Sequence, residues 1–247
     1  MSATESFFAS RSMQALEVLA FGPSTATQVA AELQVHPRTA RRLLNRMVHD
    51  GWLVRRDGPR PTYTPTLRIV ALAAQLAHRA PLVTHAADVA RDLHERLGSP
   101  VHLAIPSYRS ALRLVRADGG SAGAPALRDL APAHAIAAGK LLLAFREPWR
   151  DVVLDSPLVP VTERTVVDVG RLRAELDVTR DRGFAVEDEE FRAGARAVAV
   201  PVRAAGEVVA ALAVSSESAP LDALLANSRR VLLAAEELSA RLAVEPA

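Results

Sequence analysis

The sequence predicts an α+β protein that begins with a winged helix-turn-helix domain and continues into a larger domain of strands and helices. Three observations predict this class. Apolar residues recur at helical spacing through the first 49 residues and are followed by a short hairpin pattern. A further helical pattern over residues 66–80 predicts a linker helix. Strands then alternate with helices and end in an antiparallel hairpin. We therefore expect domains at 1–65 and 81–247.

The N-terminal region has the order helix, helix, turn, helix, hairpin. After a first helix over residues 9–21, Thr25 and Gln28 fit a capping box that predicts a short helix over Ala26–Leu33. Pro37 suits a first helical position, and a third helix is expected to reach about His49. The segments WLVRR and TYTPT, separated by DGPRP, predict a hairpin. This order is typical of a winged helix-turn-helix.

The third helix concentrates basic and polar residues on one face. Arginine can bind guanine through two hydrogen bonds, asparagine can bind adenine, and arginine and threonine bind phosphates. A solvated charged face is the alternative, but no acid balances these residues and a basic hairpin follows. We expect DNA contacts from ten residues of the helices and the wing: Thr27, Arg38, Thr39, Arg41, Arg42, Asn45, Arg46, Arg55, Arg56 and Arg60.

Charge is distributed unevenly along the chain. The formal net charge is +2, yet residues 1–70 hold nine arginines and five acidic residues. The remainder is therefore slightly acidic, which favours a polyanionic partner for the first domain alone.

Several classes of function are excluded or disfavoured by what the sequence lacks. With no cysteine, disulfides, thiolate catalysis and cysteine-based zinc sites are excluded. Neither HExxH, GxSxG nor GxGxxG occurs, so we expect no enzyme activity, no cofactor and no metal. The N-terminus lacks the pattern of a signal peptide and no apolar run is long enough to span a membrane, so we expect a cytoplasmic protein without a membrane partner.

The second half shows its own succession of elements. Helices are expected at Leu82–Leu97, Ala135–Phe145 and Val169–Arg182, with one long terminal helix over Leu221–Val244. DGGSAGAPA, residues 118–126, reads as a glycine-rich loop. Strands are expected in the following segments: VHLAIP, ALRLVRA, FAVED, ARAVAVPVRA and EVVAALAVSS.

The stretch HAIAAGKLLLAF contains Lys140, the only lysine of the chain. A phosphate-binding loop would need a second glycine upstream and a serine or threonine after the lysine, and neither is present. We therefore expect a helix start, with Lys140 in a structural ion pair with one of Asp188, Glu189 or Glu190. Apart from this ion pair, the charged run EDEE, residues 187–190 at a strand end, is expected to be mostly solvated.

Four ordered segments resemble the IclR family of bacterial transcriptional regulators: LQVHPRTARRLLNRMVHDGWL, HAIAAGKLLLA, TERTVVDVGRLRAELDVTRDRGFAVEDEEFRAGARAVAVPV and GEVVAALAVSS. The resemblance runs from about Arg11 to Leu242. It implies a winged-helix domain, a linker helix and a GAF-like effector-binding domain. It also implies dimers through the DNA-binding half, often paired into tetramers, and a small organic or aromatic acid as effector. Repression is the commoner mode in the family, and a dimer should read a near-palindromic operator.

The resemblance also implies which residues line the effector pocket: Ala131, Ala137, Ala138, Glu187, Ala197, Ala213 and Ser215. Backbone amides at a helix start, here those of Ala137 and Ala138, can receive a carboxylate. Ala131, Ala197 and Ala213 replace larger or more polar residues, which predicts a roomier pocket and an effector with an apolar body. The alternative is a DNA-binding scaffold without a ligand, whose C-terminal domain serves oligomerisation only.

Overall fold

The computed structural model describes residues 3–20, 22–77, 79–119 and 130–244. The chain divides into two compact units, Met1–His78 and Arg79–Ala247. The division places the expected linker helix in the first unit. Most of the glycine-rich loop predicted over residues 118–126 lies outside the described residues.

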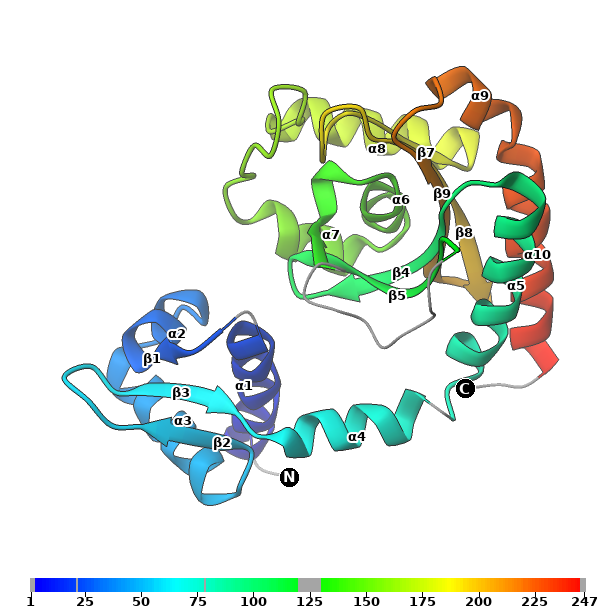
Figure 1. The fold of residues 1–247 in the computed structure, drawn as a ribbon. Coiled ribbons are helices and arrows are strands. Elements are labelled where there is room, and N and C mark those ends of the chain that lie inside the picture. Colours follow the sequence, from blue (N-terminus) through cyan, green and yellow to red (C-terminus); the bar gives the residue numbers. More distant parts are fainter. Residues whose placement is uncertain (1–2, 21, 78, 120–129, 245–247) are drawn as a thin grey trace. The chain divides into compact units, whose positions relative to one another are not determined.

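The first unit is a winged helix-turn-helix (Figure 1). Its elements are α1 (Ala3–Ala20), β1 (Ser24–Thr25), α2 (Ala26–Glu32), α3 (Pro37–His49), β2 (Leu53–Arg56), β3 (Thr62–Pro65) and α4 (Leu67–Ala77). The three strands form an antiparallel sheet in the order β1-β3-β2. The predicted capping box is present, because the Thr25 hydroxyl accepts the Gln28 amide and the Gln28 side chain accepts the Thr25 amide.

The second unit is built on a six-stranded antiparallel sheet with helices on both faces. Its strands are β4 (Val101–Ser107), β5 (Ser110–Ala117), β6 (Leu130–Pro132), β7 (Ala185–Asp188), β8 (Arg196–Ala204) and β9 (Glu207–Ser216). They lie in the order β6-β5-β4-β9-β8-β7. Its helices are α5 (Pro81–Leu97), η2 (Ala133–Ala135), α6 (Ala137–Phe145), α7 (Glu147–Leu154), α8 (Val169–Arg182), α9 (Leu221–Ala226) and α10 (Ser228–Val244).

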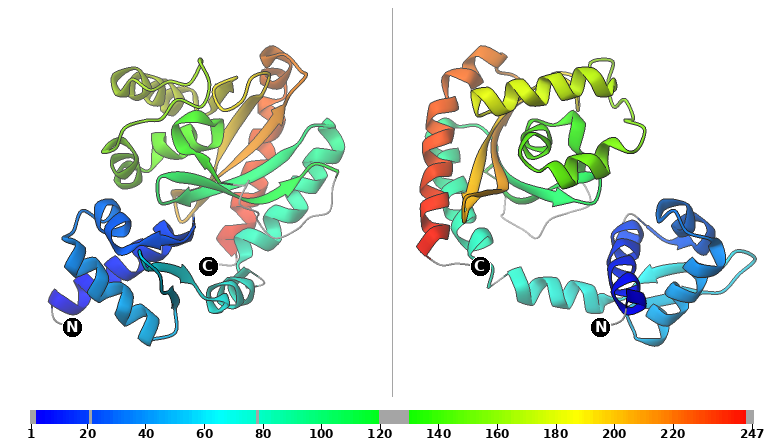
Figure 2. Two further views of the ribbon diagram at one scale, coloured as in Figure 1. Left: turned by 60° about the vertical axis from the view of Figure 1, so that its left-hand side comes forward. Right: turned by 180° about the vertical axis from the view of Figure 1, so that it is seen from behind.

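The two faces of this sheet are covered differently. α5 and α10 pack on the outer face, over large aliphatic side chains such as Leu103, Leu212 and Val214. On the inner face the sheet curls around α6, with α7 and α8 beyond it (Figures 1 and 2). The apolar side chains that the strands place on that inner face are mostly alanine, so α6 can approach the strands closely. Five of the seven residues that the resemblance assigned to an effector belong to this cluster.

One expectation about helices was wrong, and one helix begins two residues later than expected. The predicted terminal helix over Leu221–Val244 is broken, because Asn227 ends α9 and its carbonyl accepts the first hydrogen bonds of α10, from Arg230 and Val231. The segment HAIAAGK begins as a 3₁₀ turn, and α6 starts only at Ala137. The short helix α7 was not expected from the sequence.

Candidate nucleic-acid interface and effector-binding face

Helix α3 separates a buried face from an exposed basic face. Ala40, Leu43, Leu44 and Met47 are buried in the core of the first unit. The predicted DNA-contacting residues lie on the opposite side, where five are exposed and Thr39 is half-buried: Arg38, Arg41, Arg42, Asn45 and Arg46. Amphipathic spacing therefore places them as the sequence predicted.

Two contacts that sequence reasoning missed fix the start and the middle of α3. His36 is the N-cap, and its Nδ1 accepts the Arg38 amide at 3.2 Å. The buried Tyr63 hydroxyl donates to Oδ1 of Asn45 at 2.9 Å. Because that bond holds the Asn45 carbonyl, the amide NH₂ group keeps its two donors for a partner outside the protein.

A groove of about 1020 Å³ runs between the start of α2, helix α3 and the wing. It brings together four of the predicted residues: Thr27, Arg41, Arg55 and Arg60. Within the described part of the chain, no acidic residue lines it. Guanidinium groups concentrated in a concave surface favour the binding of a polyanion, because one arginine can donate two parallel hydrogen bonds to two phosphate oxygens.

The other predicted contacts lie outside that groove: Arg38, Thr39, Arg42, Asn45, Arg46 and Arg56. Some basic residues have an acidic neighbour. Arg46 contacts Asp50 at 3.4 Å and Arg55 contacts Asp57 at 3.0 Å. Both pairs are solvent-exposed, so they are weak and can be exchanged for phosphate contacts at little cost.

In the second unit, the Gly-Lys pair has a packing function. A Cβ on Gly139 would lie 2.1 Å from the Ala133 carbonyl oxygen, so only glycine allows α6 to pack against the preceding turn. Lys140 is fully buried. Its amine donates to Glu190 at 2.6 Å, which confirms the expected ion pair, and also to Glu175 of α8 at 2.5 Å, which was not expected.

The acidic run EDEE is not solvated as expected. Glu187 and Glu190 are buried, and Asp188 and Glu189 each form ion pairs with Arg196 and Arg164. Burial raises the pKa of Glu190, while Lys140 opposes that rise. The chain turns back after β7 and brings Arg196 of β8 against the run. The segment that carries Arg164 is held there because the Thr162 and Thr165 hydroxyls donate to the carbonyls of Glu189 and Glu190.

Glu187 points toward the start of α6. The backbone amides of Ala137 and Phe191 hydrogen-bond its carboxylate. Burial nevertheless raises the pKa of Glu187 to about 7, and the charge of Glu190 adds to that rise. We expected the Ala137 amide to be open to an effector carboxylate, whereas in the structure it is hydrogen-bonded to Glu187.

The residues that the resemblance assigned to an effector lie on the inner face. Five of them are buried in one alanine-rich cluster with α6: Ala131, Ala137, Ala138, Ala197 and Ala213. Strand register places Ala197 beside both Glu187 and Ser215. The structure therefore brings the seven predicted residues together around α6.

Two basic residues on the same face were missed by sequence reasoning. His102 lies opposite Ala213 on β9, and Arg113 lies opposite Ala104 of the alanine cluster. Burial, reinforced by Arg113 and Arg116, lowers the pKa of His102 to about 3, so His102 is neutral at physiological pH. Arg113 stacks on Phe191, with its Cζ atom 5.9 Å from the ring centroid.

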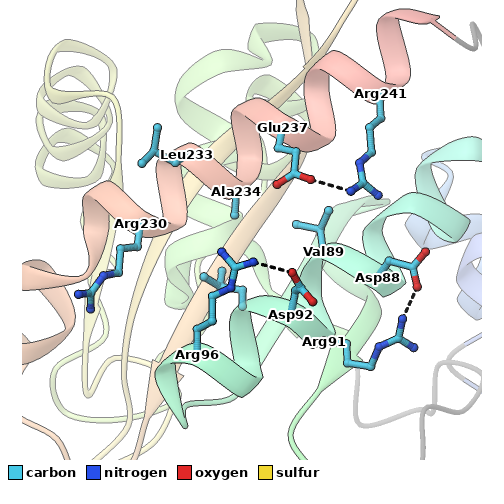
Figure 3. Close-up of a pocket in the computed structure, with 11 residues that line it drawn as sticks. Asp88, Val89, Arg91, Asp92, Arg96, Arg230, Leu233, Ala234, Glu237 and Arg241 are labelled. Carbon is cyan, nitrogen blue, oxygen red and sulfur yellow. Dashed lines mark hydrogen bonds and ion pairs between the residues drawn. The ribbon is translucent and has the colours of Figure 1, made fainter.

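A second groove, of about 630 Å³, lies between α5 and α10 on the outer side of the second unit (Figure 3). Charged residues of both helices line it, and its acids pair with arginines of their own helix: Asp88 with Arg91, Asp92 with Arg96, and Glu237 with Arg241. None of the residues that the sequence singled out lines this groove. Pairs at this spacing stabilise exposed helices, which accounts for the charges without a ligand.

Two broader features bear on the class of protein. None of the described helices is long and apolar enough to cross a membrane. Across the described residues, histidine and acidic side chains form no group of three that could hold a metal ion.

A basic winged helix-turn-helix joined to a GAF-like α/β domain defines a DNA-binding regulator. Family models agree with this class along most of the chain. The helix-turn-helix model of the IclR family matches residues 9–57, and the C-terminal model of the bacterial transcriptional regulator IclR matches residues 74–239. The chain belongs to the IclR family, and it is an IclR-type DNA-binding transcriptional regulator rather than an enzyme.

Relatives and solved structures cover nearly the whole chain. The probable transcriptional regulator SauR of Cupriavidus necator is 29% identical over 92% of this chain and 94% of its own. BhcR of Paracoccus denitrificans is 29% identical over 93% of this chain and 85% of its own. Among solved structures, an IclR homologue of Microbacterium hydrocarbonoxydans complexed with 4-hydroxybenzoate is 26% identical, with a TM-score of 0.61 over 95% of this chain and 98% of its own.

Proposed function

We propose that this regulator represses transcription in the cytoplasm by binding a near-palindromic operator, and that a small organic or aromatic acid in the second unit changes that binding. The DNA-binding part of this proposal rests on the basic groove of the first unit, which is lined by Thr27, Arg41, Arg55 and Arg60. The exposed residues of α3 would enter the major groove and read bases, while the wing arginines would hold the phosphate backbone.

Dimerisation through the first unit is supported by the surface of α4. Leu67, Val70 and Leu76 are 83%, 62% and 60% exposed, which is unusual for aliphatic residues on a helix in water. A partner subunit would cover them. The first turn of α4 is well anchored, because Arg68 donates to the Asp50 carbonyl at 3.1 Å and stacks 4.1 Å from the Trp52 ring centroid. We therefore propose a homodimer or a dimer of dimers.

The effector part of the proposal concerns the seven residues gathered around α6. Five are small apolar side chains, which suit an apolar ligand body, and Glu187 and Ser215 supply polar groups. A related structure that holds 4-hydroxybenzoate supports an aromatic acid. Such an acid changes operator affinity only if it binds the DNA-free and DNA-bound forms of the protein with different affinity.

DNA binding is tested by selecting operators from a random duplex pool with the full-length protein, then measuring affinity for the selected sequence. Arg42→Ala is expected to weaken binding by about 10-fold or more and to relax the preference at one base position. Arg173→Ala, which removes an exposed arginine of α8, is the matched control and should leave affinity unchanged. Equal affinities of the two variants would contradict the placement of α3 in the major groove.

Effector binding is tested with 4-hydroxybenzoate, benzoate and the neutral amide of 4-hydroxybenzoate as a ligand panel. We expect at least one acid of the panel to bind with measurable heat and to shift operator affinity.

A ligand-independent scaffold is the second candidate, and one observation favours it: the predicted pocket residues are buried against one another. In that case no acid would bind, and the second unit would act in assembly alone.

A further inference from the structure

A buried tyrosine of the wing contacts a residue on the exposed face of α3. Tyr63 lies on β3, the central strand of the sheet in the first unit, and the register pairs it with Ser24 on one side and Arg55 on the other. Its side chain is 2% exposed, and its hydroxyl donates to Oδ1 of Asn45 at 2.9 Å. Because the strand is paired on both sides and the ring is packed in the core, the hydroxyl presents a fixed donor to α3.

Asn45 stands on the side of α3 that carries the arginines. Arg38, Arg41 and Asn45 follow one another at spacings of three and four residues, so they form one stripe along the helix, and all three are exposed. Arg41 and Tyr63 also line the basic groove of the first unit. Asn45 therefore lies one turn beyond a groove residue, on the face that α3 would turn toward base edges in the major groove.

The bond to Tyr63 fixes which end of the Asn45 amide faces outward. A side-chain amide has a carbonyl oxygen that only accepts hydrogen bonds and an NH₂ group that only donates them. The carbonyl oxygen lies against the buried hydroxyl, on the protein side. Within the described part of the chain the NH₂ group makes no hydrogen bond, and Asn45 is exposed. Asn45 therefore offers DNA a pair of donors.

The four bases differ in what they present to such a pair of donors. In the major groove guanine presents two acceptors, O6 and N7, whereas cytosine presents a donor and thymine one acceptor beside a methyl group. Adenine presents an acceptor beside a donor, so an amide binds it in two places only when both its oxygen and its nitrogen face the base. Guanine is thus the base that satisfies both donors of the Asn45 amide.

We propose that Asn45 selects guanine at one position of each operator half-site, and that Tyr63 positions the amide for this choice. Guanine replaces adenine, the base that asparagine binds when both ends of its amide face the DNA. A bidentate contact of this kind distinguishes the right base from a wrong one by roughly 5- to 150-fold. The inference rests on the proposed placement of α3 in the major groove, and it adds the base that is read and the residue that sets it.

The test is selection of operators from a random duplex pool by the full-length protein, followed by affinity measurements on duplexes that differ at one base pair of each half-site. Asn45→Ala locates the position, because the preference there should disappear while the other positions keep theirs. Wild type should prefer guanine over adenine at that position by about 5-fold or more. Thr64→Val, which removes an exposed hydroxyl of β3, is the matched control and should keep the preference of wild type.

Two further variants separate the roles of Asn45 and Tyr63. Tyr63→Phe should lower the preference for guanine over adenine by about 2- to 10-fold, the value of one hydrogen bond, because the amide can then turn. Asn45→Asp keeps one oxygen for the Tyr63 hydroxyl and puts a second oxygen in place of the NH₂ group, so it should prefer cytosine, whose N4 amino group donates. Each preference is a ratio within one variant, so a general loss of folded protein does not change it.

The base found at the position that depends on Asn45 decides the outcome. Any base other than guanine would overturn this inference, and adenine or cytosine would show that the carbonyl oxygen faces the DNA instead. An operator without a position that depends on Asn45, or a Tyr63→Phe preference equal to that of wild type, would also contradict it, while the proposed binding of DNA by the first unit would stand. Failure of wild type to select any sequence would count against both.

Discussion

The buried amine of Lys140 is the point at which one substitution should most disturb the second unit. Its side chain has no exposed surface, and it lies between Glu190, whose side chain is 10% exposed, and Glu175, which is 29% exposed. Lys140→Met keeps most of the volume of the side chain and removes its charge. Two carboxylates would then remain partly buried without their common partner.

The magnitude follows from these distances. At an effective dielectric constant of about 20, a pair of charges 2.6 Å apart interacts by about 6 kcal/mol before desolvation is counted. Desolvation of three charged groups offsets much of this, and removal of one partner from a buried pair typically costs about 3–5 kcal/mol. We expect a loss in that range at neutral pH. The loss should shrink toward acidic pH, where Glu190, freed of its lysine, takes up a proton and needs no cation.

Urea unfolding of the full-length protein measures this loss. The chain has two tryptophans, Trp52 in the first unit and Trp149 in the second, so a Trp52→Phe background makes fluorescence report on the second unit. The double variant Lys140→Met, Glu190→Gln should recover about 2 kcal/mol of the loss, since the more deeply buried of the two uncompensated carboxylates is gone. A loss below about 1 kcal/mol, or a double variant less stable than Lys140→Met, would show that the two carboxylates do not depend on the Lys140 charge.

Three other substitutions should act through contacts described above. Gly139→Ala should destabilise the second unit by about 1–3 kcal/mol or more in urea unfolding, because the added Cβ meets the Ala133 backbone. Folding raises the pKa of Glu187 from 4.5 to about 7, so between these pH values the folded protein keeps a proton that the unfolded chain has lost. The folded state therefore loses about 3 kcal/mol of stability as the pH rises from 4.5 to 7. Glu187→Gln should therefore stabilise the protein at pH 8 more than at pH 5, and parallel pH profiles would contradict the assignment. Tyr63→Phe should reduce operator affinity severalfold by releasing Asn45 while costing less than about 1.5 kcal/mol of stability, measured by anisotropy and by thermal unfolding.

Most of the first unit could be predicted from local signals. The capping box at Thr25, the proline at the start of α3 and the amphipathic spacing of Leu43 and Leu44 are properties of neighbouring residues, and the structure confirms each. The Tyr63–Asn45 bond could not be predicted in this way, since it joins the wing to α3 and depends on how the sheet packs against that helix.

The second unit was less predictable where distant segments meet. Glu175 lies 35 residues after Lys140, so no local pattern links them. The face of the sheet on which Arg113 lies could not be predicted, because a β-bulge between β4 and β5 shifts the register between Leu103 and Ala104. Counting alternate residues back from Arg116, which pairs with His102, places Arg113 on the opposite face, and only the bulge returns it to the α6 side.

We propose that the basic groove of the first unit binds the phosphate backbone of DNA. The salt dependence of affinity for the selected operator, measured for wild type, Arg55→Ala and the control Arg173→Ala, is the sharpest test of that contact. Binding should weaken steeply with salt, and the log–log slope of Arg55→Ala should be shallower by about 0.9, the value of one phosphate contact. A flat response for wild type, or the same slope for Arg55→Ala as for wild type, would show that this groove does not bind the DNA backbone.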